Sequence, residues 1–269
     1  MPTPKELLDA GHLKAAIEAL TQEVRESPAD PQKRTFLFEL LAFAGDWDRA
    51  EKQIAAAAGA DAPAQMAAGV YRGLLQAERD RARVFAGKAR PRFLRAVPGY
   101  VEKSLAALGR ISEGDLAAAR AFLDEAEEDR PSLSGKRGGS PFEDLRDFDD
   151  LFGGVVEMVF KGEYTWFPLE QARSLEPTAP KKLRDLIWPG ARITADDGTT
   201  GDVFLFALYP GSWAHEDELV RLGRMTDWKS LSDDLQAGQG LRSFLVDGED
   251  VSIFELGPVD FDPHEGLPS

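Results

Sequence analysis

The sequence predicts an α+β protein in which N-terminal α-helical repeats are followed by a small β-rich α+β domain. Three observations carry this prediction. A short sequence motif that begins with glycine recurs in the first half of the chain at the spacing of a helical repeat. A Ser-, Gly- and Pro-rich stretch at 132–141 then interrupts the helical pattern. Beyond that stretch, short apolar runs flank turn residues, as they do in β-hairpins. We therefore expect a helical domain over 1–131, a linker over 132–141 and a β-rich domain over 142–269.

Helices account for the first half because apolar residues recur there at three- and four-residue steps. The expected helices cover 4–10, 13–26, 31–44, 47–58, 62–86, 98–111 and 115–129. One stretch stands out, since the letters FLFELLAFA at 36–44 make a helix that is apolar nearly all round. Such a helix is either buried at the centre of a domain or offers one apolar face to a partner, and burial is favoured here.

The repeated phrase begins at Gly11, Gly45 and Gly114. The first two glycines lie 34 residues apart, and the third lies 69 residues beyond the second. In each copy a bulky apolar residue stands two positions after the glycine, and an alanine stands five positions after it: Ala16, Ala50 and Ala119. This spacing resembles the tetratricopeptide repeat, a helical hairpin with a period of about 34 residues. No glycine stands near Arg79, where a further copy is expected, so one repeat is degenerate or replaced by a longer helix.

The second half shows strand patterns joined by turns. Strand-like runs at 191–195 and 202–208 flank the letters DDG, and runs at 241–246 and 251–256 flank DGED. Helical or irregular pieces are expected between them, at 169–175, 181–186 and 216–222. Four of the five tryptophans lie in this half, and buried aromatic rings of this kind favour a structural role over a binding surface: Trp166, Trp188, Trp213 and Trp228.

Composition narrows the possible functions. A hydrophobic content of 43% supports folded cores, and the absence of cysteine excludes disulfides, thiolate metal sites and cysteine nucleophiles. No secretory signal and no apolar run of about 20 residues is present, so we expect a cytoplasmic protein without a membrane span. The net charge is −15, and −13 of it falls in 132–269. That charge repels phosphate backbones and anionic lipids, so neither nucleic acid nor membrane is an expected partner.

One stretch of the chain is basic, although the net charge of the whole chain is negative. Residues 72–95 carry eight arginines and lysines against only Glu78 and Asp80. Two interpretations stay open at this point: a docking patch for an acidic partner, or a face that pairs with the acidic second half of the same chain.

The search for catalytic motifs finds no nucleophile elbow, P-loop or dinucleotide fingerprint, and His12, His215 and His264 are far apart. The letters GQG at 238–240 are more typical of a turn than of a phosphate loop. The HEDE run at 215–218 predicts an acidic helix start, which the helix dipole favours. No cofactor is expected.

An acidic cluster lacks the EF-hand spacing, so helix capping and solvated charge account for it better than a cation does: Glu143, Asp144, Asp147, Asp149, Asp150 and Glu157. A metal-dependent hydrolase in the acidic half is kept as a less favoured alternative.

Several phrases, in order, resemble the ImpE/TagJ family of type VI secretion accessory proteins. They are the opening segment 7–49 with FLFELL at 36–41 and GDW at 45–47, then GEYTWFP at 162–168, LRDLIWP at 183–189, RLGRMTDW at 221–228 and GQG at 238–240. The resemblance spans nearly the whole chain. One departure is local: the family tends toward Asp-x-Asp-x-Arg before Gly-Pro, whereas residues 147–154 here read DFDDLFGG.

The resemblance implies a non-enzymatic adaptor that binds the N-terminal helix of the small sheath subunit, TssB, and affects how the ClpV unfoldase handles the sheath. An amphipathic helix of that kind is expected to lie in an apolar groove of the helical half. The expected contacts comprise five apolar residues and three arginines that steer the partner by their charge, called charge guides below: Phe36, Phe38, Leu41, Phe43 and Trp47, with Arg79, Arg83 and Arg92. A generic tetratricopeptide scaffold for another partner is the alternative.

Overall fold

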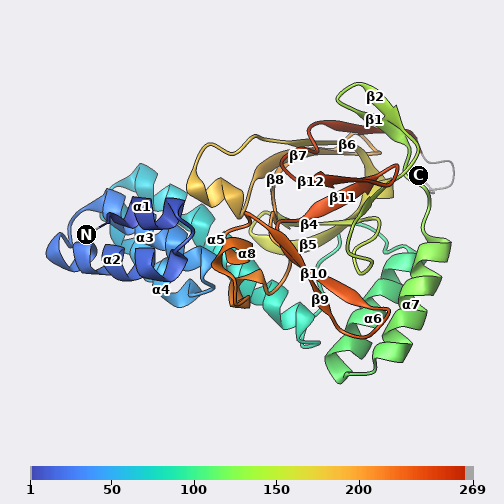
Figure 1. The fold of residues 1–269 in the computed structure, drawn as a ribbon. Coiled ribbons are helices and arrows are strands. Elements are labelled where there is room, and N and C mark those ends of the chain that lie inside the picture. Colours follow the sequence, from blue (N-terminus) through green and yellow to red (C-terminus); the bar gives the residue numbers. More distant parts are fainter. Residues whose placement is uncertain (1, 264–269) are drawn as a thin grey trace.

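The seven helices expected in the first half are all present in the computed structural model, which describes residues 2–263, and their ends fall within two residues of expectation (Figure 1). Five of the seven start behind a side-chain cap that accepts from a backbone N–H of the first turn, as the sequence signals require. The helices are α1 (Pro4–Asp9), α2 (Leu13–Glu26), α3 (Pro31–Phe43), α4 (Trp47–Ala58), α5 (Ala62–Phe85), α6 (Gly99–Glu113) and α7 (Leu116–Asp129).

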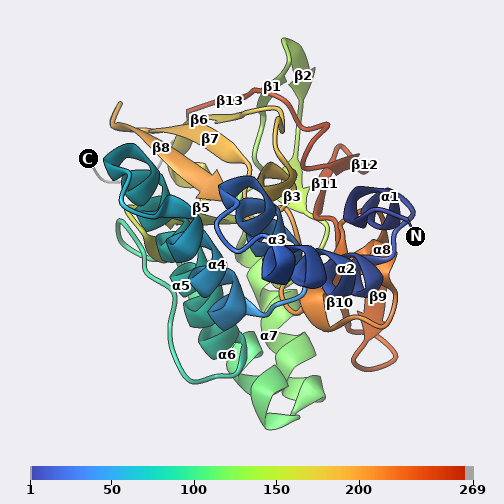
Figure 2. The same ribbon diagram turned by 90° about the vertical axis from the view of Figure 1, so that its left-hand side faces the viewer.

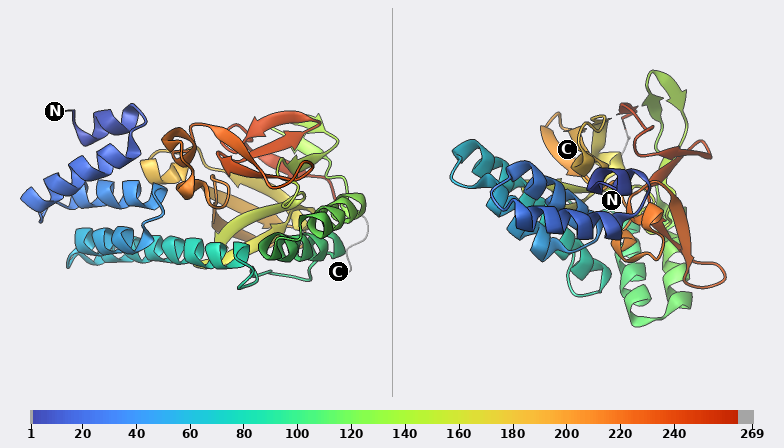
Figure 3. Two further views of the ribbon diagram at one scale, coloured as in Figure 1. Left: turned by 60° about the horizontal axis from the view of Figure 1, so that its bottom comes forward. Right: turned by 60° about the vertical axis from the view of Figure 1, so that its left-hand side comes forward.

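The repeat signal corresponds to three helical hairpins. Gly11, Gly45 and Gly114 adopt φ values of 86°, 69° and 81° at the turns, a region that favours glycine. The alanine five residues after each glycine is fully buried, so the paired helices approach closely there. In place of a turn near Arg79, α5 continues over 24 residues and runs beneath both halves of the molecule (Figure 3). Of the two alternatives for the missing copy, the structure shows the longer helix. The expected burial of the apolar stretch in α3 is also observed, since residues 37–43 are buried.

Two of the repeat glycines also contact the second half of the chain. A Cβ atom at Gly45 would lie 2.6 Å from the Trp213 ring, and one at Gly11 would lie 2.6 Å from Leu219, whereas a Cβ at Gly114 would meet open space. Trp213 and Leu219 belong to η3 (Ser212–Ala214) and α8 (Glu218–Arg221), which lie beside the first hairpins (Figure 2). These two glycines therefore lie in helical turns and also allow the second half of the chain to pack closely against the repeats.

We expect Gly45→Ala to cost more stability than Gly114→Ala. Both place a Cβ in the left-handed region, at about 1–2 kcal/mol, but only the change at Gly45 must also displace Trp213, which raises the total to about 3 kcal/mol. Urea unfolding followed by circular dichroism measures both variants. Equal losses would show that the contact with Trp213 contributes nothing.

The second half is built on an antiparallel eight-stranded sheet in the order β2-β1-β13-β6-β7-β8-β4-β5, with a β12-β11-β3 sheet and a β10-β9 hairpin beside it. The expected hairpins are confirmed, since β7 pairs with β8 and β11 with β12. The strands are β1 (Gly135–Arg137), β2 (Ser140–Phe142), β3 (Leu145–Asp147), β4 (Val155–Phe160), β5 (Glu163–Pro168), β6 (Ala172–Pro177), β7 (Gly190–Ala195), β8 (Thr200–Leu205), β9 (Thr226–Ser230), β10 (Gln236–Gly240), β11 (Ser243–Val246), β12 (Glu249–Ser252) and β13 (Val259–Phe261).

Two expectations for this half need correction. Residues 169–175 form only a short 3-10 turn, η1 (Leu169–Gln171), before entering β6, and the GQG letters lie within β10 rather than in a turn. A Cβ at Gly238 would lie 2.6 Å from the Tyr209 ring, so this glycine is required by close packing inside the strand.

The stretch 132–141 is not an unstructured linker. It supplies β1 and part of β2, and β1 pairs with β13 near the other end of the chain. A Cβ at Gly135 would lie 2.1 Å from the Asp260 carbonyl oxygen, and Gly138 and Gly139 make the turn at φ 56° and 89°. The glycines of the predicted linker therefore serve close strand pairing and a tight turn.

Two hydrophobic cores hold the fold together. One lies between the sheets of the second half, with Met158, Leu205 and Phe244 fully buried in it. The other fills the helical repeats and continues into the second half through Trp188 and Phe206. This core contains residues from both sides of the 132–141 stretch. The division into independent domains at that point therefore stays a prediction, which expression of the second half alone would test.

Candidate partner-binding groove

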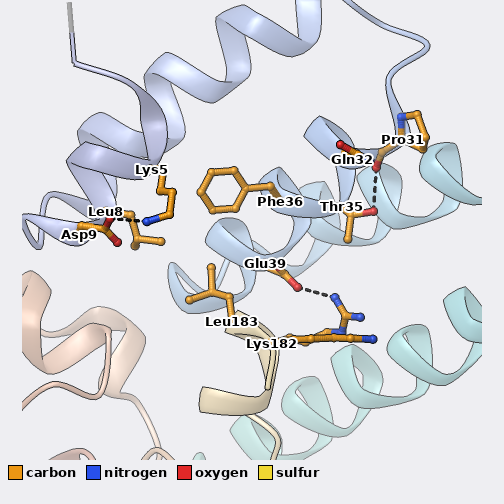
Figure 4. Close-up of a pocket in the computed structure, with 11 residues that line it drawn as sticks. Lys5, Leu8, Asp9, Pro31, Gln32, Thr35, Phe36, Glu39, Lys182 and Leu183 are labelled. Atoms are coloured by element: carbon orange, nitrogen blue, oxygen red, sulfur yellow. Dashed lines mark hydrogen bonds and ion pairs between the residues drawn. The ribbon is translucent and has the colours of Figure 1, made fainter. Parts of the chain in front are cut away.

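An apolar groove lies where α1 and α3 of the helical half face the short 3-10 helix η2 (Leu183–Leu186) of the second half (Figure 4). Its volume is about 780 Å³. Leu8, Phe36 and Leu183 supply apolar surface from three different elements. The complete lining is Lys5, Leu8, Asp9, Pro31, Gln32, Thr35, Phe36, Glu39, Lys182, Leu183 and Arg184.

The elements around the groove are fixed by local contacts. Asp185 accepts hydrogen bonds from the backbone N–H groups of Lys181 and Lys182, both at 2.9 Å, which closes the turn of η2. Just beyond it, the Trp188 indole donates to Glu78 of α5 at 3.0 Å and its ring stacks on Phe38, with centroids 6.4 Å apart. The LRDLIWP segment is therefore anchored to α3 and α5, and that anchor holds η2 as the second wall of the groove.

The floor of the groove carries a charged pair. Arg184 donates to Glu39 at 2.5 Å, and the two side chains are 13% and 10% exposed. Burial raises the pKa of Glu39, and the attraction of Arg184 opposes that rise. The Arg184 guanidinium also lies over the Tyr71 ring, 4.7 Å from its centroid. At the rim, Lys5 pairs with Asp9 at 2.6 Å.

Of the five apolar residues predicted to contact a partner, Phe36 is partly exposed and lines the groove. Phe38, Leu41 and Phe43 are only 0%, 1% and 1% exposed, because α3 is covered on all sides, so in the folded chain these three belong to the core and not to a surface. Trp47 is half-buried at a different place, where its ring meets Trp213 edge-on with centroids 5.8 Å apart.

The three predicted charge guides lie away from the groove lining and are paired within the chain. Arg79 contacts Asp48 and Glu51 of α4 at 2.9 and 2.8 Å. Arg83 lies 3.6 Å from Asp80 and is exposed. Arg92 pairs with Glu163, and its backbone bridges to β5 at Thr165.

Other members of the basic stretch behave in the same way. Arg90 pairs with Glu102 at 2.5 Å, and Arg95 pairs with Asp196 and Asp197 across the two halves. The interpretation as a face that pairs with the second half is therefore supported only in part: Arg92 and Arg95 pair with that half, whereas Arg79, Arg83 and Arg90 pair within the first half. The partner-binding role of all eight predicted residues stays a prediction.

Sequence reasoning missed Lys5, Leu8, Lys182, Leu183 and Arg184 as groove residues. The LRDLIWP phrase was a signal that its segment matters. However, Arg184 of this segment pairs with Glu39 of α3, 145 residues away, and no sequence periodicity indicates a contact over that distance.

Half of the acidic cluster is buried, which corrects the expectation of solvated charge for Asp147, Asp149 and Glu157, whereas Glu143 is exposed and Asp144 and Asp150 are half-buried. Glu157 receives two hydrogen bonds from Arg81 of α5, at 2.8 and 2.5 Å, and pairs also with Arg242, which in turn pairs with Asp147. Tyr209 donates to Asp147 at 2.9 Å. Burial favours a raised pKa for Glu157, but attraction to Arg81 and Arg242 outweighs it and holds that pKa below its ordinary value. The network joins the helical half to the sheet.

The Asp147 and Glu157 carboxylates of this cluster are held by arginines within the fold. Within residues 2–263 no group of three or more His, Asp or Glu side chains is placed to hold a metal ion. Asp217 of the HEDE run accepts from the Leu219 N–H at 2.8 Å and starts α8, as expected for an acidic helix start. His215 contacts Asp227 at 3.1 Å, and His264 lies outside the described part of the chain. In the same part of the chain, no helix has the length and apolar character needed to cross a membrane.

The structure thus combines helical hairpins, an apolar groove beside them and a β-rich half in one chain. The ImpE protein family model matches residues 139–260. The type VI secretion system accessory component TagJ of Pseudomonas aeruginosa is 37% identical over 259 residues, which cover 96% of this chain and 91% of that protein. The chain therefore belongs to the ImpE/TagJ family of type VI secretion accessory proteins.

The fold agrees with a solved structure. The crystal structure of protein VPA1032 from Vibrio parahaemolyticus superposes with a TM-score of 0.89, at 25% identity, covering 97% of this chain and 98% of that one. The arrangement of helical repeats and β-rich half is thus shared across nearly the whole length of both chains.

Proposed function

We propose that this protein is a non-enzymatic accessory protein of the type VI secretion system that binds the N-terminal helix of the small sheath subunit, TssB. Through that contact it modulates how the ClpV unfoldase handles the sheath. The family supports a role beside the secretion apparatus. The observation that carries the binding proposal is the groove of about 780 Å³ with Leu8, Phe36 and Leu183 on its walls.

A helix is the form of ligand that suits this groove. Its walls are two helices and a 3-10 turn, so an added helix packs its side chains between theirs, and anchors at three- and four-residue intervals fill the apolar space. Lys5 and Lys182 at the edges interact with the polar flanks of such a helix. Phe36, a partly exposed aromatic ring in the lining of the groove, is the expected principal anchor.

Phe36→Asp is expected to weaken binding of a synthetic TssB N-terminal helix at least about 30-fold, because it places a charge where an apolar anchor is buried. Isothermal titration calorimetry with the full-length protein measures this. Leu183→Asp changes the opposite wall and is expected to act in the same direction.

Met66→Asp is the matched control, since Met66 is 78% exposed on α5 outside the groove lining. Thermal unfolding checks that each variant is folded. The proposal fails if the wild-type protein shows no binding at high micromolar peptide, or if Met66→Asp weakens binding as much as the groove variants do.

A further inference from the structure

A second, smaller hollow lies on the β-rich half and shares no lining residue with the groove between α1, α3 and η2. Its walls are the end of β3, the loop that follows β3, and the β9–β10 hairpin with its turn. Its volume is about 400 Å³. This lies at the lower end of the range for ligand sites, which suits a single side chain better than a helix.

Two aromatic rings form the apolar wall of the hollow. Phe148 and Trp228 pack with their centroids 4.8 Å apart, and Trp228 also meets the buried Tyr209 ring at 5.9 Å. The Phe148 backbone N–H donates to the Ser243 carbonyl at 3.0 Å. Phe148 and Trp228 are both half-buried, so each keeps part of its surface open to the hollow. The rings are therefore held in place without a ligand, which lowers the entropic cost of binding one.

Two aspartates bring uncompensated charge to the rim. Asp233 and Asp234 are exposed in the turn between β9 and β10, and neither forms an ion pair within residues 2–263. The Ser232 hydroxyl holds one oxygen of Asp234 at 2.7 Å. The remaining charged lining residues, Arg146 and Asp150, pair with each other at 3.0 Å. The hollow therefore presents net negative charge beside an aromatic surface.

An arginine side chain complements both features. Its planar guanidinium packs against aromatic rings and donates parallel N–H groups to carboxylates. A lysine ammonium has no plane to stack and is more strongly hydrated, so it gains less from the same surface. Phosphates and carboxylates are repelled by the aspartates at the rim.

We propose that this hollow is a docking site for one arginine side chain from a basic segment of a partner protein. The guanidinium packs against Trp228 and pairs with Asp233 and Asp234, whose side chains are open to solvent. The site is separate from the groove, so it supplies a second contact that does not depend on the proposed function.

The test is a titration of the full-length protein, labelled with fluorotryptophan and observed by fluorine NMR. The signal of Trp228 is assigned by its absence from Trp228→Phe. The probe is the tripeptide Gly-Arg-Gly with both ends blocked, added at constant ionic strength. Two matched peptides replace arginine by lysine or by citrulline, whose neutral urea keeps the shape of the guanidinium.

We expect the arginine peptide to shift the Trp228 signal saturably at millimolar concentration. The lysine peptide is expected to bind at least about threefold more weakly, and the citrulline peptide to cause no saturable shift. The double variant Asp233→Asn/Asp234→Asn is expected to weaken binding of the arginine peptide about fivefold or more.

Glu249→Gln/Asp250→Asn is the matched control variant. It also removes two exposed carboxylates, but from β12 and outside the lining of the hollow. Because solvent and salt screen distant surface charges, it is expected to change binding by less than about twofold.

The inference is overturned if citrulline or lysine binds as tightly as arginine, or if the wild-type protein shows no saturable shift. It is also overturned if the β12 variant weakens binding as much as the Asp233/Asp234 variant, since the overall negative charge of the chain would then account for the effect. None of these results affects the proposed function, which depends on the groove lined by Phe36.

Discussion

Arg242→Met is expected to lower the free energy of unfolding by about 3–5 kcal/mol, because it removes the cation shared by two buried carboxylates. Asp147 and Glu157 both pair with Arg242, and all three side chains are at most 1% exposed. The guanidinium also lies over the rings of Phe152 and Tyr209, 4.3 and 4.8 Å from their centroids, and methionine keeps part of that packing. The loss is therefore dominated by Asp147, whose one ion pair among residues 2–263 is with Arg242, whereas Glu157 keeps its pair with Arg81.

Urea unfolding of the full-length protein measures this, and Arg192→Met is the matched control. Arg192 pairs with Asp202 at 3.0 Å, but the two side chains are 61% and 79% exposed. The same substitution there is expected to change stability by less than about 0.5 kcal/mol. Similar losses in the two variants would show that the buried network contributes no more than a surface ion pair.

The network matters because of the parts of the chain that it joins. Arg81 brings α5 of the helical half to Glu157 of β4, and it also donates to the Leu208 carbonyl at 2.9 Å. The charged partners of the network are held in one geometry, which favours a single orientation of the two halves in addition to the packing of their shared core. We interpret the network as the device that fixes the second half, and with it η2, against the repeats.

The first half was predictable because its signals are local. Helical periodicity, capping residues and turn glycines all act within a few residues, and they gave seven helices with nearly correct ends. What the glycines do beyond turning was not predictable. That Gly45 contacts Trp213 depends on a packing partner 168 residues away.

The second half was harder because its strands pair over long distances. The β4–β5 hairpin escaped prediction since its turn, Lys161-Gly162, places a lysine at φ 51° and lacks the usual Asn-Gly or Asp-Gly signal. The letters SLSGKRGGSP suit a linker as well as a tight hairpin, and only pairing with β13 decides between them. Phe38, Leu41 and Phe43 lie in the core and not on the expected surface, and the sequence does not reveal this because apolar character does not distinguish a core from a groove.

The stability of the protein is expected to depend on pH through Asp149. Burial, followed by repulsion from Asp147, raises the pKa of Asp149 to about 7, although the N–H groups of Gly238 and Leu151 stabilise its charged form. In the unfolded chain an aspartate titrates near pH 4. The folded state therefore holds a proton that the unfolded state has already lost across this interval. The stabilisation is full below about pH 4 and is lost as pH rises toward 7.

The shift of about three pKa units corresponds to about 4 kcal/mol. Comparing the pH dependence of stability between Asp149→Asn and wild type isolates the contribution of Asp149, because the other titrating groups are common to both proteins. At pH 4 the variant is expected to be the less stable, since its amide N–H₂ opposes one of two backbone donors, Gly238 N–H or Leu151 N–H.

Between pH 4 and 8 the variant should gain on wild type by up to about 4 kcal/mol, with the change centred below pH 7. Urea unfolding at half-unit pH intervals measures the difference. A difference that stays constant with pH would mean that Asp149 keeps its charge inside the fold. In that case the two backbone donors and Arg242 outweigh burial and the repulsion from Asp147.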